Sequence, residues 1–133
     1  MKNALLSFLL FTCVKLAWGQ AKVPVENVLI SSEKKKTGVS TSEKGELQVN
    51  VSPKDLHKCK TRGWVRYSDV GARGDGKTDD IDAIAAAHAV ANQYRLSVKA
   101  DEGASYYIGG KERTAIIRTE TDFGTAAFII DDT

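Results

Sequence analysis

The chain has 133 residues, of which 42% are hydrophobic and 27% are charged, so it can build one modest hydrophobic core and is not disordered throughout. Its 19 basic and 17 acidic side chains give a formal net charge of +2. Since no basic stripe with interleaved aromatic residues occurs along the chain, the composition excludes nucleic acid and an anionic membrane surface as expected partners.

Residues 1–19 have the pattern of a secretory signal peptide. Lys2 provides the positive start, a short apolar run follows, and Ala17 and Gly19 fit the small positions before a cleavage site. The run is shorter than the roughly 20 residues needed to cross a bilayer, so we expect no membrane span. Cleavage removes Lys2 and Lys15, so the 19 basic residues become 17, equal to the 17 acidic ones. The sequence therefore predicts an exported chain with a net charge of zero that is secreted, periplasmic or bound at the cell surface.

Cysteine content predicts no internal disulfide. Cys13 lies in the predicted leader, which leaves Cys59 as the only cysteine of the exported part. His57 is too close in sequence to indicate a catalytic pair with it, so a buried, inert thiol is expected.

Residues 20–62 are expected to form a variable lead-in segment or a linker, either irregular or containing a hairpin. Residues 23–30 have the composition of an edge strand with a proline near its start, and residues 31–45 have that of a solvated loop with a lysine run. Residues 46–51 alternate polar and apolar side chains, which predicts a half-buried strand. The amino-acid composition changes after Arg62, and we place the start of the main domain at residue 63.

A glycine and aspartate cluster follows the aromatic segment 64–67. Gly71, Gly74 and Gly76 allow the positive φ or close backbone approach that a compact turn needs. Asp75 and Asp79 can accept hydrogen bonds from the crowded amides of such a turn. These roles explain the acids structurally, so the cluster is interpreted as architecture and not as a catalytic centre.

A helix is predicted directly after this turn, with Thr78 or Asp79 as its N-cap and an end near residues 92–94. The positions that recur at three- and four-residue spacing are Ile81, Ile84, His88 and Ala91. They predict a narrow apolar face, with His88 as a packed or partly exposed histidine at the margin of the core.

Short strands are expected in the remainder of the chain. The predicted strands are 96–100, 106–108, 114–118 and 127–130, separated by turns at 101–103, 109–110 and 122–124.

The run from Tyr67 to Ile84, YSDVGARGDGKTDDIDAI, closely resembles the opening motif of the pectate-lyase-like superfamily, including its rhamnogalacturonase-type and polygalacturonase-type members. The motif residues are Asp69, Gly71, Gly74, Asp75, Gly76, Asp79 and Asp80. The resemblance covers residues 64–132, although the segment 98–108 lacks the proline usual in the family. It implies a mainly β fold in which residues 63–133 form an N-terminal capping helix and the first rungs of a right-handed parallel β-helix, a single-stranded solenoid.

The resemblance also implies a function. It predicts the N-terminal, truncated portion of an exported protein that acts on an acidic, pectin-like polysaccharide by lyase or glycoside hydrolase chemistry. The catalytic residues would lie outside this chain, which would be inactive alone. A non-catalytic carbohydrate-binding or structural surface protein is the alternative.

No catalytic, cofactor or metal residue can be assigned from the sequence. The resemblance alone admits Ca²⁺, and Asp131 with Asp132 would supply too few ligands to form a site. Arg113 and Arg118 are candidates to bind an acidic sugar. The simpler interpretation is that both side chains lie on a solvated strand face. The stretch 71–78 also fits a phosphate-binding loop, but acids within and after it would repel phosphate, so nucleotide binding is not expected.

Overall fold

The computed structural model of the protein describes residues 28–133, so the predicted signal peptide and the first residues of the lead-in lie outside the described residues. The elements in chain order are β1 (Val28–Ser31), β2 (Gly38–Thr41), β3 (Leu47–Asn50), α2 (Pro53–Arg62), β4 (Trp64–Arg66), the 3-10 helix η1 (Tyr67–Val70), β5 (Asp75–Asp79), α3 (Ile81–Tyr94), β6 (Ser97–Lys99), β7 (Ser105–Ile108), β8 (Thr121–Asp122) and β9 (Ala127–Ile130). Neither helix of this part of the chain has the length and apolar composition that crossing a bilayer requires.

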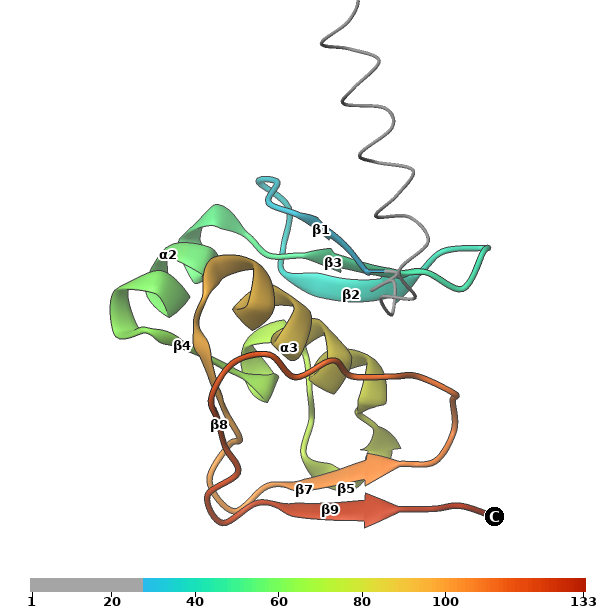
Figure 1. Ribbon diagram of the computed structural model, residues 1–133. Coiled ribbons are helices and arrows are strands. Elements are labelled where there is room, and N and C mark those ends of the chain that lie inside the picture. Colours follow the sequence, from blue (N-terminus) through green and yellow to red (C-terminus); the bar gives the residue numbers. More distant parts are fainter. Residues whose placement is uncertain (1–27) are drawn as a thin grey trace, which may run out of the picture.

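The strands form three sheets of three strands each. In the first, of order β1-β3-β2, β3 pairs in parallel with β1 and antiparallel with β2. The other two, β4-β6-β8 and β5-β7-β9, contain only parallel pairs. Helix α3 lies between the β1-β3-β2 sheet on one side and the strands of the other two sheets on the opposite side (Figure 1).

The predicted right-handed parallel β-helix is wrong. Residues 28–133 form three small sheets with short strands and two helices, a small α/β-like domain that contains no solenoid. The prediction treated α3 as a cap with one narrow apolar face, but the buried residues of α3 surround its axis. They are Ile81, Ala83, Ile84, Ala85, Ala86, Ala87, His88, Ala89, Val90 and Ala91. A helix that is buried all round is the centre of a core and not its lid.

Helix α2 was not predicted, although its signals are present in the sequence. The Ser52 hydroxyl accepts a hydrogen bond from the Asp55 amide at 3.2 Å, and Pro53 occupies the first turn, where its missing N–H is harmless. Gly63 ends the helix in the left-handed region with φ 89°. The helix buries Leu56 and Cys59, and Cys59 is a free, buried thiol as expected.

Several strand predictions are confirmed, and others are not. The strands β3, β6, β7 and β9 lie at or within one residue of their expected positions. No strand forms in the segment 114–118, whereas β2, β5 and β8 were not predicted. The segment 31–45 is therefore not a loop throughout, because β2 lies within it and pairs with β3. Strand β5 has the sequence DGKTD, which offers no alternation of apolar side chains, so only its pairing with β7 makes it a strand.

Candidate functional site

The glycine and aspartate turn lies between η1 and α3 and includes β5. The Asp75 carboxylate accepts hydrogen bonds from the amides of Lys77, at 3.0 Å, and Thr78, at 2.7 Å. The Thr78 hydroxyl also donates to it at 2.8 Å. These bonds stabilise the ionised form, with the Thr78 amide first among them, and lower the pKa of Asp75 to about 2. The prediction that Asp75 accepts from turn amides is confirmed.

Asp79 ties the start of α3 to a distant loop. One carboxylate oxygen accepts from the Ile81 amide at 3.1 Å, and the other accepts from the Gly110 amide at 2.7 Å. Asp79 is an amide acceptor as predicted, but its donors belong to α3 and to the distant loop and not to the glycine turn. The prediction of Thr78 or Asp79 as the N-cap is wrong by one or two residues, because Asp80 occupies that position.

Asp80 is the buried carboxylate of the turn, with 2% of its surface exposed. Its side chain makes no capping hydrogen bond to α3. It reaches back to the loop before β5, where it accepts from the amides of Arg73 at 2.8 Å and Gly74 at 2.9 Å. Asp80 thus holds the glycine loop against the first turn of the buried helix.

The three glycines of the turn all have positive φ, as the sequence predicts: 105° at Gly71, 61° at Gly74 and 71° at Gly76. They differ in their surroundings. A Cβ at Gly74 would lie 2.8 Å from the Cβ of Ala104, whereas a Cβ at Gly71 would meet no atom within 4 Å. Gly74 therefore combines a conformational and a steric requirement.

We expect Gly74→Ala to lower the free energy of unfolding by about 2 kcal/mol, because it adds overpacking to left-handed strain. Gly71→Ala is the matched control, since it imposes the strain alone and is expected to cost about 1 kcal/mol. Urea denaturation followed by circular dichroism measures both values. Equal losses in the two variants would show that close approach to Ala104 contributes nothing.

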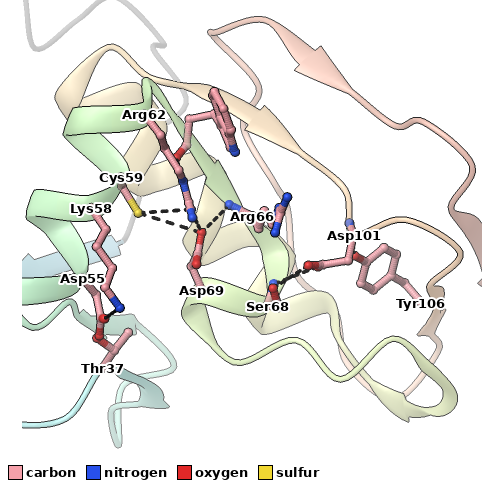
Figure 2. Close-up of polar contacts among 11 residues, drawn as sticks. Thr37, Asp55, Lys58, Cys59, Arg62, Arg66, Ser68, Asp69, Asp101 and Tyr106 are labelled. Atoms are coloured by element: carbon pink, nitrogen blue, oxygen red, sulfur yellow. Dashed lines mark hydrogen bonds and ion pairs between the residues drawn. The ribbon is translucent and has the colours of Figure 1, made fainter.

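Asp69 organises a second polar cluster, which Figure 2 shows beside α2. Its carboxylate pairs with the Arg62 guanidinium and accepts from the Arg66 amide at 2.7 Å. The Cys59 sulfur lies 3.9 Å from the same carboxylate and 3.5 Å from the Arg62 guanidinium. Burial raises the pKa of the Cys59 thiol, so the cluster does not produce a reactive thiolate.

Asp101 forms a third group that joins η1 to the loop before β7 (Figure 2). Its carboxylate accepts from the Ser68 amide at 3.0 Å and from the Tyr106 hydroxyl at 2.8 Å. The Tyr106 oxygen in turn accepts from the Asp101 amide at 2.8 Å. The sequence marked Asp101 only as a turn residue, since its bond to Ser68 joins residues 33 positions apart.

His88 lies in the core and not at its margin, with 1% of its surface exposed. Its Nε2 is 3.0 Å from the Tyr67 hydroxyl, and the two rings meet edge to face at 5.7 Å. Within residues 28–133, the Nδ1 atom has no hydrogen-bond partner. Burial lowers the pKa of His88 to about 4, which keeps the ring neutral near pH 7.

The described residues do not fit a calcium site. Within residues 28–133, no group of three or more His, Cys, Asp and Glu side chains is placed to hold a metal ion. The Asp131 carboxylate accepts instead from the Tyr107 hydroxyl at 2.9 Å and from Thr133. Arg113 donates to the Asp82 carboxylate at 2.8 Å, so this candidate for sugar binding already has an ion-pair partner.

The structure places Asp75, Asp79 and Asp80 around one turn as separate amide acceptors. The fourth motif acid, Asp69, lies apart from them and pairs with Arg62. Sequence reasoning missed the outward-facing residues of β4 and β6, among them Trp64 and Lys99. The signal that could have found them is the alternation around Val65 and Val98, which are both fully buried. No family model, no curated protein and no solved structure matches this chain.

Proposed function

We propose that this chain is a non-catalytic part of an exported carbohydrate-active protein that acts on an acidic, pectin-like polysaccharide. The non-catalytic assignment rests on one observation, that the motif carboxylates already accept hydrogen bonds from backbone amides. Asp75, Asp79 and Asp80 each accept two backbone amide hydrogen bonds within their own turn or from a neighbouring loop. A glycosidase acid or nucleophile must instead face the substrate, and a lyase base must reach a sugar proton.

Two features of the sequence support the remainder of the proposal. The leader pattern of residues 1–19 supports export. The resemblance of residues 67–84 to the opening motif of pectate-lyase-like proteins supports an acidic polysaccharide as the substrate of the protein to which this chain belongs.

The test is expression of the full chain in a secreting host, followed by affinity electrophoresis in gels that contain polygalacturonate or a neutral galactan. We expect secretion with a mature N-terminus at Gln20, retardation by polysaccharide, and no release of reducing ends or unsaturated products. A gel without polysaccharide is the control for mobility. Unchanged mobility in both polysaccharide gels would refute carbohydrate binding, and product release would refute the non-catalytic assignment.

A further inference from the structure

The outward face of sheet β4-β6-β8 carries a cleft made of two adjoining hollows. Their volumes are about 300 Å³ and about 260 Å³, and both are lined by Lys99 and Asp122. Val65 and Val98 point to the opposite face, since each is 0% exposed. Side chains alternate along a strand, so Trp64 and Lys99 face the cleft. The hollows are near the lower limit of ligand-pocket volumes, roughly 300 Å³.

An aromatic ring lies in one wall of this cleft. The Nζ atom of Lys99 is 4.5 Å from the centroid of the Trp64 ring, and Ser97 is paired with Trp64 in register across β4 and β6. An indole offers an apolar surface for the C–H groups of a sugar, and Ser97 offers a hydroxyl at its side. The flexible Lys99 stem allows its ammonium group to move from the ring toward a ligand.

Two cations are placed side by side on the same face. Arg66 and Lys99 are direct partners in the parallel register of β4 and β6. Within residues 28–133, no carboxylate forms an ion pair with either of them, in contrast to Arg62 and Arg113. Like charges directly opposite one another across strands are destabilising. Asp122 is the direct partner of Lys99 on β8 and offsets part of this repulsion. An anionic group bound between Arg66 and Lys99 would offset more of it.

The acids around the cleft restrict which anion fits. Glu102 and Glu120 line the two hollows, and Asp122 lies between them, where its carboxylate accepts from the Gly124 amide at 2.9 Å. Their negative charge opposes a polyphosphate or nucleic acid. Carboxylates are also good acceptors for hydroxyl groups. The cleft therefore suits one sugar unit that carries a single carboxylate among several hydroxyls.

We propose that this cleft binds a uronate residue of an acidic glycan. The Trp64 ring contacts the apolar face of the sugar, and Arg66 with Lys99 holds its carboxylate through charge-assisted hydrogen bonds. The assignment rests on the proposed carbohydrate function and adds to it a location and a set of recognition residues. None of these residues belongs to the motif 67–84.

Trp64 makes the site directly observable. The chain contains two tryptophans, Trp18 and Trp64, and Trp18 lies in the predicted signal peptide. Trp64 is therefore the only tryptophan of the cleaved chain, and Trp18→Phe makes it the only one in an uncleaved chain. The probes are hexagalacturonate and its carboxyl-reduced, neutral counterpart galactohexaose. We expect hexagalacturonate to change Trp64 emission with saturation, and galactohexaose to bind about tenfold more weakly or not at all.

The matched variants remove two positive charges each. We expect Arg66→Gln with Lys99→Gln to weaken hexagalacturonate binding by about tenfold or more, and the exposed pair Lys44→Gln with Lys54→Gln to leave it unchanged. Thermal melting checks that each variant is folded, and Lys99→Arg, which keeps the charge, is expected to retain binding. Calorimetry follows binding independently of the fluorescence.

The outcomes separate this inference from the proposed function. Two results would refute the assignment of the uronate site to this cleft without refuting carbohydrate binding. They are hexagalacturonate binding that persists in the Arg66→Gln, Lys99→Gln variant, and equal affinity for galactohexaose. Absence of binding to both probes by calorimetry, together with unretarded migration in both polysaccharide gels, would overturn the proposed function itself.

Discussion

Replacement of Asp80 by alanine is expected to lower the free energy of unfolding by about 3 kcal/mol, since hydrogen bonds to a charged acceptor contribute roughly 1.5–3 kcal/mol each. The carboxylate is 2% exposed and accepts from the Arg73 and Gly74 amides. Its loss leaves both amides without their acceptor and frees the glycine loop from α3. For a domain of this size, the midpoint of thermal unfolding should fall by roughly 15 °C.

Two further variants make this experiment specific. Asp80→Asn keeps one acceptor oxygen, so it is expected to lose roughly half as much stability as the alanine variant. Asp132→Ala changes an exposed acid near the other end of the described chain and is expected to stay within about 0.5 kcal/mol of wild type. Urea denaturation measures all three. A loss below about 1 kcal/mol for Asp80→Ala would contradict the structural role of this carboxylate.

A fall in pH is expected to lower the free energy of unfolding, because His88 is buried in its neutral form. Burial lowers the pKa of this ring to about 4 in the folded protein, from its ordinary value of 6.5. The unfolded chain therefore binds a proton at His88 at a higher pH than the folded one does, and stability is lost as the pH falls from 6.5 towards 4. Between pH 7.5 and pH 4.5 the expected loss is about 2.5 kcal/mol, since one pKa unit corresponds to about 1.4 kcal/mol.

The chain offers a matched control, because His57 is its only other histidine and is exposed on α2. His88→Gln removes the titrating group and keeps a hydrogen-bonding side chain next to the Tyr67 hydroxyl. We expect it to be less stable than wild type at pH 7.5 and to lose the pH dependence in this window. His57→Gln should retain that dependence. The acids with lowered pKa, which are Asp55, Asp75, Asp82 and Asp131, contribute their loss only as the pH falls below about 3.8.

These values would come from urea titrations at a series of pH values. A wild-type stability that stays constant between pH 6.5 and pH 4.5 would show that His88 takes up its proton without opening the core. The same result would mean that the unpartnered Nδ1 atom is reached by solvent in the folded protein.

Local features of this protein could be predicted from the sequence because their causes are local. The amide-accepting role of Asp75, the positive φ of the turn glycines and the end of α3 each depend on a few consecutive residues. The strands at 47–50 and 127–130 were predicted from alternation and from β-branched and aromatic composition. The signal peptide stays a prediction, since residues 1–19 lie outside the described residues.

Only the tertiary structure decided what surrounds α3. Its alanine-rich sequence allows close packing on every side, and periodicity cannot show whether one layer or two will cover such a helix. The β1-β3-β2 sheet and the two parallel sheets supply those layers, and for that reason the solenoid with a capping helix is wrong. Long-range contacts likewise decided the bond between Ser68 and Asp101, the buried place of His88 and the position of Arg66 beside Lys99. These contacts join residues far apart in sequence, whose meeting no local pattern encodes.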